Sequence, residues 1–295
     1  MKLFLSIRPA RRGGGSNTFA VNAARWAAGN RCKLVTAIED ADVAVVIAHC
    51  GVTEESLRRA RDRNCFVVHR IDEHFGRFTD GRYIDKHEKI KRFNAYADVT
   101  VFQSEWVRRT ALPHLGSANH VVILNGADPA RFRPGRTAGC DVGHLTWGTI
   151  DKKRLDLVHE AIQSYPDEHF RLVGRHRSVT DPDIDFNRRN VSLRGERNRR
   201  QIPAELRKMK VLFFPSENDP CPNTVAEAIL CGVPVCYSDS GGTPELVRDC
   251  GEPLDRFPHL LEHLGKYRER CLGRTDLAFD DVMRKYEALW QGRRN

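Results

Sequence analysis

Two carboxylates eight positions apart stand in the segment Phe213–Val235. There an apolar strand pattern gives way to a polar loop, and a helix is predicted to begin near Asn223 or Thr224. The backbone N–H groups at a helix start favour anions. Asp219 lies in the loop and Glu227 one turn inside the helix, so the pair could hold sugar hydroxyls on either side of a bound phosphate. The alternative is structural: Asp219 caps the helix and Glu227 is an exposed helix residue.

The rest of the chain alternates short β-branched runs with amphipathic segments of helical length. This alternation predicts an α/β fold with parallel sheets covered by helices on both faces. The pattern breaks at Asp128–Gly139, so we expect two doubly wound, Rossmann-like domains, residues 1–135 and 136–295, with a cleft between them. The last helix, about residues 277–292, is expected to pack back toward the N-terminal domain.

The composition is that of a globular protein, with 40% hydrophobic and 29% charged residues in a chain of 295. It excludes collagen, coiled coil and general disorder. The nine cysteines form no CxxC pair, which predicts reduced core thiols rather than disulfides or structural zinc. The longest apolar run, Val43–Ala48, is too short to cross a bilayer, and the apolar stretch at the N-terminus is too short for a signal peptide. We therefore expect a cytoplasmic protein that at most contacts the inner membrane face.

The formal net charge is +9, from 48 basic and 39 acidic side chains, and 37 of the basic residues are Arg. Such a surplus favours polyanions such as nucleic acid, phosphoglycans or anionic lipid, although it can also reflect genomic base composition. Basic clusters occur at 58–63, 86–92 and 188–200. The clusters at 58–63 and 86–92 are interpreted either as contacts for an anionic acceptor or acidic lipid, or as plain solvated faces. The cluster at 188–200 belongs to the second domain and is interpreted as lying near the nucleotide or as facing water.

Several segments together carry a family resemblance. Asp219–Val235 looks like the E-x7-E signature of the retaining glycosyltransferases of family 4, with Asp in the first position. These enzymes have the GT-B fold. The resemblance spans nearly the whole chain through five further segments in matching order: Gly13–Asn17, Ala97–Trp106, Ile123–Pro134, Lys153–Leu157 and Gly241–Glu245.

The resemblance implies that the second domain binds a nucleotide-diphosphate sugar and that the first, shortened domain binds the acceptor. Lys153 matches the lysine that neutralises the donor diphosphate, where negative charge develops as the glycosidic bond breaks. Glu227 matches the acid that holds the ribose hydroxyls. Asp219 stands where relatives contact the transferred sugar, one methylene shorter than the usual Glu.

The resemblance also assigns donor contacts to two backbone segments. At the start of the signature helix these are Cys221, Pro222, Asn223 and Thr224, with Pro222 shaping the loop without donating an N–H. At the first helix the glycine loop, with Gly14 and Gly15, is expected to approach the donor phosphate or the acceptor. Gly241 and Gly242 are expected to form a turn close to the donor, or a plain turn.

Two positions depart from the family pattern. Gly148 stands where relatives carry a second diphosphate cation, whose role could pass to Lys152, to Arg154 or to an Arg from elsewhere in the chain. Asp72 stands where relatives end a strand with a His facing the reacting sugar, and it could act as a base or orienting group there. His69 is interpreted as a satisfied core residue.

His49 is a second candidate at a similar sheet edge. Asp181–Asp185 is interpreted as an exposed acidic loop rather than a metal site. The resemblance thus predicts an enzyme: a retaining, metal-independent transferase that needs no cofactor beyond its nucleotide-sugar substrate.

Two alternatives to this function remain open. The first is a GT-B enzyme that glycosylates DNA or another polyanion, in line with the Arg surplus. The second is a non-catalytic scaffold that binds nucleotide sugars. The acceptor is left open, with an anionic glycan or glycolipid as the first candidates.

Overall fold

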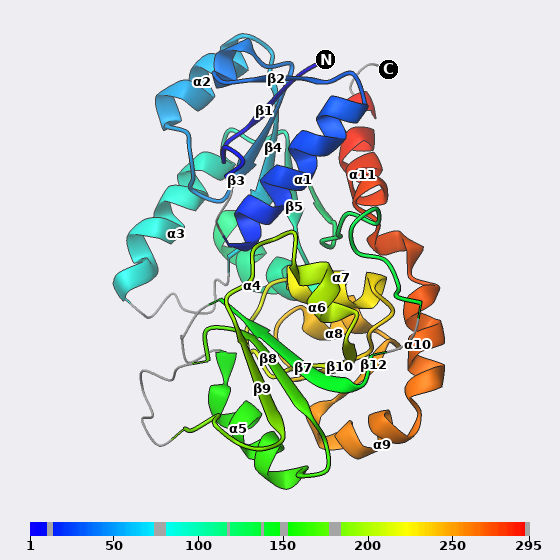
Figure 1. Cartoon of the computed structure of the whole chain (residues 1–295). Coiled ribbons are helices and arrows are strands. Elements are labelled where there is room, and N and C mark those ends of the chain that lie inside the picture. The colour runs from blue at the N-terminus through cyan, green and yellow to red at the C-terminus, as the bar shows by residue number, and fades with distance from the viewer. Residues whose placement is uncertain are drawn as a thin grey trace. The chain divides into compact units, whose positions relative to one another are not determined.

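The computed structural model describes residues 1–10, 14–73, 81–116, 119–136, 139–147, 153–176 and 184–292. By internal contacts the chain divides into two units, shown in Figure 1. Unit 1 comprises Met1–Asn125 with Phe279–Asn295, and unit 2 comprises Gly126–Ala278. Each unit is built on a six-stranded sheet whose described pairings are all parallel. The predicted α/β class with two doubly wound sheets is confirmed.

The sheet of unit 1 has the strand order β2-β1-β3-β4-β5-β6. Its central strands are continuous apolar runs because helices cover both faces of a parallel sheet; all six residues of β4 are buried. The strands are β1 Lys2–Leu5, β2 Lys33–Val35, β3 Val43–Ile47, β4 Phe66–Ile71, β5 Val99–Phe102 and β6 His120–Val122. The helices are α1 Gly15–Gly29, α2 Glu54–Asp62, α3 Gly81–Asn94, α4 Glu105–Leu115 and α11 Phe279–Gln291.

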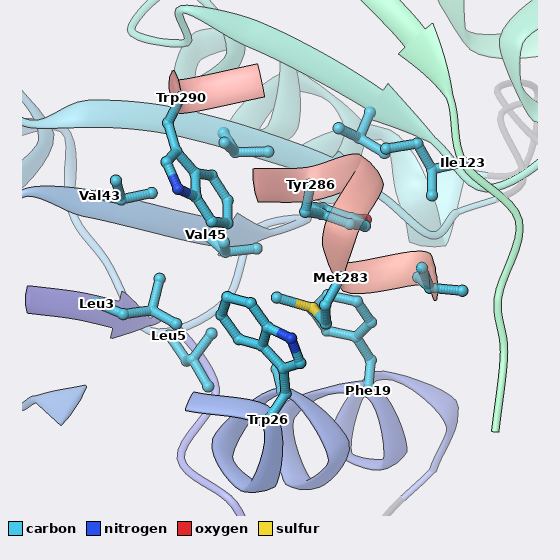
Figure 2. Packing of buried hydrophobic residues seen from close by; sticks show 14 of the residues in the cluster. Leu3, Leu5, Phe19, Trp26, Val43, Val45, Ile123, Met283, Tyr286 and Trp290 are labelled. Carbon is cyan, nitrogen blue, oxygen red and sulfur yellow. The ribbon is translucent and has the colours of Figure 1, made fainter. Parts of the chain in front are cut away.

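The main core of unit 1 joins the first and last helices of the chain (Figure 2). Aromatic side chains of α11 meet those of α1: the Phe19 ring lies 5.7 Å from Phe279 and 5.4 Å from Tyr286. Trp26 and Trp290 complete this cluster against the apolar side chains of β1 and β3. Each buried aromatic ring removes a large apolar area from water, so this packing attaches α11 to unit 1.

The sheet of unit 2 has the order β12-β11-β10-β7-β8-β9. Its core includes Val158 of α5, Phe213 of β10 and Phe257 of α9. The strands are β7 Asp141–Thr146, β8 Phe170–Gly174, β9 Val191–Gly195, β10 Met209–Phe214, β11 Val235–Tyr237 and β12 Gly251–Pro253. The helices are α5 Leu155–Ser164, α6 Ile202–Leu206, α7 Asn223–Leu230, α8 Thr243–Val247, α9 Phe257–Glu262 and α10 Leu264–Leu272.

The structure also contains β12 and α8, and it divides the segment Pro258–Arg270 between two helices, α9 and α10. α9 ends at Glu262, and His263, which follows it, has a φ of −120° that is not helical. A strand of three residues such as β12 is too short to show a period and forms by pairing with β11. Among the described residues, no helix is long and apolar enough to span a membrane.

Candidate functional site

The switch point of the unit 2 sheet brings together two loops that are distant in sequence. β7 pairs with β8 on one side and β10 on the other, and the chain crosses to β10 only after β9. Ligands of doubly wound sheets bind where the connections diverge beyond the strand ends. Lys153 follows the β7 loop and Asp219 lies in the loop after β10. The Lys153 Nζ atom is 3.6 Å from Asp219 Oδ2, and these side chains keep 19% and 17% of their exposure.

The loop that carries Asp219 is held by the loop after β11. The backbone N–H of Asn218 donates to Ser240 Oγ at 3.0 Å, and Ser238 Oγ donates to the carbonyl of Pro215 at 2.8 Å. The N–H of Gly242 donates to the carbonyl of Asp219 at 2.9 Å. These bonds fix the position of the Asp219 backbone independently of any ligand.

Gly241 lies against this loop with φ +69°. A Cβ atom there would come within 2.5 Å of the Asp219 carbonyl oxygen and 2.7 Å of its nitrogen. We therefore expect Gly241→Ala to lower the free energy of unfolding by about 1–3 kcal/mol, because the clash adds to the strain of a left-handed backbone. Urea denaturation measures this.

The control for Gly241 is Gly265→Ala. Gly265 lies in α10, and a Cβ atom added there would meet open space, so an unchanged or slightly higher stability is expected. Equal effects of both changes would contradict the packing role of Gly241.

The signature helix α7 begins at Asn223, with Thr224 next and with Pro222 as the residue before the first turn. The N-cap residue is Pro222, whose side chain forms no capping hydrogen bond, so Asp219 is not the N-cap residue of this helix. Cys221 is buried at 3% exposure and anchors the loop below the helix start. The helix thus presents its first backbone N–H groups at the end of β10, as an anion-binding site requires.

Glu227 lies one turn inside α7 and keeps partial solvent contact. Burial raises the pKa of its carboxyl to about 7, while the positive charges of Arg199 and Arg131 act in the opposite direction. The structural alternative of an ordinary exposed helix carboxylate is therefore wrong. A carboxylate held at this cost to stability points to a functional role.

Arg154, one of the proposed replacements for the second diphosphate cation, is already paired. Its guanidinium contacts Asp156 at 2.7 Å and also Glu217, and these carboxylates raise its pKa. Its charge is therefore balanced within the protein. Gly148 and Lys152, like residues 181–183 of the acidic loop, lie outside the described residues.

In unit 1, Asp72 directly follows β4 and is held by two partners that the sequence did not reveal. Ser16 Oγ donates to Asp72 Oδ2, and Arg70 Nη1 donates to the same oxygen at 3.2 Å. Arg70 is 1% exposed, and its guanidinium also donates to Asn125 at 2.8 Å and stacks 4.2 Å from the centre of the Phe19 ring. A buried charged guanidinium fixes the direction of its carboxylate partner.

The glycine loop reaches this carboxylate through α1. Gly14 is the cap residue and Gly15 the first residue of that helix, and its second residue, Ser16, donates to Asp72. Gly14 and Gly15 therefore lie next to a residue, Ser16, that is hydrogen-bonded to Asp72. Gly13 lies outside the described residues.

His69, inside β4, and His49, after the end of β3, differ in their surroundings. His69 is buried, with Nδ1 at 2.8 Å from Asn94 Oδ1 and Nε2 at 2.9 Å from the Ala48 carbonyl, so it is the satisfied core residue expected. His49 follows β3 at the edge where Asp72 follows β4, and its buried Nδ1 has no hydrogen-bond partner within the described part of the chain. Burial and then the charge of Lys86 lower the pKa of His49, so its imidazole is neutral at pH 7.

A cavity of about 590 Å³ opens beyond β1 and β2 of unit 1. Its lining is mainly apolar, with Phe4, Leu34 and Ile38 among its walls and Arg8 and Glu39 as charged groups. Pockets of this size and polarity hold small molecules. Among the residues that the structure describes, no group of three or more His, Cys, Asp or Glu side chains is placed to hold a metal ion.

Residues 142–254 match the family model described as Glycosyl transferases group 1. That range contains Lys153, Asp219 and Glu227. No curated protein sequence is significantly similar to the chain.

Solved structures match over almost the whole chain. HepE from Anabaena in complex with UDP-glucose has a TM-score of 0.74 at 16% identity, covering 99% of this chain and 98% of that one. Sucrose-phosphate synthase from Thermosynechococcus elongatus has a TM-score of 0.76 at 13% identity, with coverage of 99% and 98%. AviGT4, a glycosyltransferase involved in avilamycin A biosynthesis, has a TM-score of 0.68 at 16% identity, with coverage of 98% and 97%. The chain therefore has the GT-B fold, as predicted.

Proposed function

We propose that this protein is a glycosyltransferase that moves a sugar from a nucleotide-diphosphate donor to an acceptor hydroxyl. The observation that carries the proposal is the meeting of Lys153 and Asp219 at the switch point of unit 2, 3.6 Å apart. The match of residues 142–254 to a glycosyltransferase family model supports it. Because HepE was crystallised with UDP-glucose, UDP is the first nucleotide to test.

In the proposed donor site each group has a separate task. Lys153 would neutralise the diphosphate, and the N–H groups of Asn223 and Thr224 would meet phosphate and sugar oxygens at the start of α7. Asp219 would accept hydrogen bonds from the transferred sugar, and Glu227 from the ribose. We further propose membership of the family 4 enzymes, with Asp219 and Glu227 as the two acids of the signature.

The proposed reaction retains the anomeric configuration and needs no metal. The acceptor oxygen attacks the anomeric carbon on the face from which the diphosphate leaves. As the bond to the leaving oxygen breaks, positive charge spreads over the sugar ring and negative charge collects on the diphosphate, where Lys153 stabilises it. The acceptor proton passes to the departing diphosphate, so charge and atoms balance without a metal ion.

Unit 1 is the proposed acceptor unit. Its mainly apolar cavity beyond β1 and β2 suits an acceptor that carries an apolar group. Asp72 would orient the acceptor hydroxyl, with His49 as a neutral group at the same edge of the sheet. The protein is expected to act in the cytoplasm, at most touching the inner membrane face.

The test is a thermal-shift screen with UDP-glucose, UDP-N-acetylglucosamine, GDP-mannose and ADP-glucose, followed by the assay of sugar release from the best binder. Stabilisation by one nucleotide, together with slow hydrolysis, supports the proposal. NMR of the released sugar or product then reports whether the configuration is retained. Stabilisation without any turnover would instead indicate a non-catalytic scaffold. No stabilisation by any donor would contradict the proposal.

Asp72→Asn tests the acceptor side. The amide keeps the size of the side chain and its hydrogen bond to Ser16 but removes the negative charge that orients the acceptor hydroxyl. We expect transfer to fall by about 10²-fold, the effect of a misplaced reacting group, while the dissociation constant of the donor changes less than about threefold. Initial rates and donor titrations measure the two quantities. A parallel loss of donor binding would place Asp72 in the donor site instead.

A further inference from the structure

A second cavity, of about 480 Å³, lies in unit 2, and its lining is strongly charged. Five of its lining residues are arginines: Arg131, Arg133, Arg136, Arg200 and Arg207. Of the described residues that line it, none is acidic. It shares no lining residue with the proposed donor cluster of Lys153, Asp219 and Glu227.

The backbone that carries these arginines is well fixed. Ala127 pairs with Ala278 in a parallel bridge, and the N–H of Ala130 donates to Asp128 Oδ1 at 3.0 Å. Arg131 donates to the carbonyl of Arg199. The N–H of Arg200 donates to Asn198 Oδ1 at 3.0 Å. These contacts fix the backbone positions from which the arginine side chains extend.

The positive charge of four of these arginines is not balanced by an ion pair within the described protein. The side chains of Arg133, Arg136, Arg200 and Arg207 form no ion pair with any residue that the structure describes. Elsewhere in unit 2 arginines are paired: Arg171 contacts Asp141 at 2.6 Å and Glu205 at 3.1 Å. Glu205 lies on α6 beside the cavity but is committed to Arg171 and Arg197.

Like charges that line one cavity repel one another, so an anion that enters the cavity would stabilise this arrangement. Guanidinium groups bind phosphate through two parallel hydrogen bonds. A concave site of this volume fits a small molecule, whereas a duplex or a bilayer requires an extended surface. The site therefore selects a compact ligand with more than one phosphate charge.

We propose that the arginine cavity formed by Arg131, Arg133, Arg136, Arg200 and Arg207 binds a small phosphorylated anion, as a second anion site separate from the donor site. Arg131 connects the two sites, because its charge also acts on Glu227. An anion in the cavity offsets that charge, so occupancy changes the affinity for the donor. The cavity thus gives unit 2 a means of regulation by a phosphorylated metabolite.

The test uses inorganic pyrophosphate as the probe and isothermal titration calorimetry at constant ionic strength. The Lys153→Ala variant serves as background, so that the proposed donor site contributes little. We expect one pyrophosphate per chain. Adding Arg200→Gln and Arg207→Gln should raise its dissociation constant about 10- to 100-fold, as expected for the loss of one or two charge-assisted contacts.

The matched control is Arg188→Gln with Arg189→Gln, which removes the same charge from the same unit at exposed positions outside the cavity. This pair should change the dissociation constant less than about twofold, and melting temperatures check that both variants fold. An equal loss in both pairs, or no binding of pyrophosphate to the native chain, would overturn the proposal. So would binding to vesicles of phosphatidylcholine and phosphatidylglycerol without binding of soluble pyrophosphate.

The outcome is independent of the proposed transferase activity. Pyrophosphate binding that depends on Arg200 and Arg207 would establish the cavity even if no nucleotide sugar bound. Conversely, donor turnover without pyrophosphate binding would support the proposed transferase activity and contradict the proposal of a second anion site. If both hold, the native enzyme should show a donor affinity that changes with pyrophosphate, and the Arg200→Gln, Arg207→Gln variant should lose that change.

Discussion

Lys153→Ala is expected to lower the turnover rate about 10²–10³-fold, the effect of removing one fixed group that stabilises developing negative charge. The ammonium group lies at the switch point of unit 2, 3.6 Å from Asp219 and 5.7 Å from the centre of the Phe214 ring. These two contacts hold the ammonium group in position even when no donor is bound. Initial rates of nucleotide release, with the best donor from the thermal-shift screen, measure the loss.

The control for Lys153 is Lys266→Ala, at an exposed position on α10, which should keep turnover within about twofold of the native rate. Lys153→Arg is informative as well, because it restores the charge with a different shape and should recover part of the activity. Full activity in Lys153→Ala would refute the assignment of the diphosphate to this residue. A loss confined to KM would show that Lys153 binds the ground state and the transition state equally.

Glu227→Gln is expected to weaken donor binding about 10- to 100-fold, because a neutral amide replaces the carboxylate that we propose accepts hydrogen bonds from the ribose hydroxyls. The same substitution should stabilise the unliganded protein at neutral and alkaline pH. Burial raises the pKa of Glu227 to about 7, from 4.5, and Gln removes the unfavourable buried charge. A residue that only supported the fold would be expected to lose stability on replacement.

The sign of the pH dependence follows from linkage. Between about pH 4.5 and 7 the folded state holds the Glu227 proton more tightly than the unfolded state, so this group lowers the free energy of unfolding as the pH rises. Well above pH 7 both states are ionised and the effect is constant. The stability gain of Glu227→Gln over the native protein should therefore grow from pH 5 to pH 8, to an upper bound of about 3 kcal/mol.

Urea denaturation of the unliganded proteins at several pH values measures this gain, and donor titrations at the same pH values give the binding loss. Glu262→Gln, an exposed change at the end of α9, is the control and should alter neither quantity. Unchanged donor affinity in Glu227→Gln would remove this residue from the proposed site. A gain that did not vary with pH would contradict the raised pKa.

The class of fold and the segments that carry the chemistry could be predicted from the amino-acid sequence alone. Apolar runs such as Val43–Ile47 are buried on both faces, and their alternation with amphipathic segments leaves parallel sheets as the consistent arrangement. Asp219 and Glu227 could be placed on a loop and a helix because their spacing and the polar start of α7 are local features. Local features of this kind depend only on residues that are close together in the sequence, so they can be predicted from it.

The contacts between residues that are distant in the sequence are determined only by the tertiary structure. Lys153 contacts Asp219 because β7 and β10 are neighbours in the sheet, and no local pattern reports that strand order. The same holds for Ser16 and Arg70 around Asp72, and for the arginines that line the unit 2 cavity from two separate segments, 131–136 and 200–207. In the sequence these arginines were part of a diffuse surplus of charge. Long-range packing of parallel strands gathers part of that surplus around one cavity, since it alone sets the distances between side chains on separate loops.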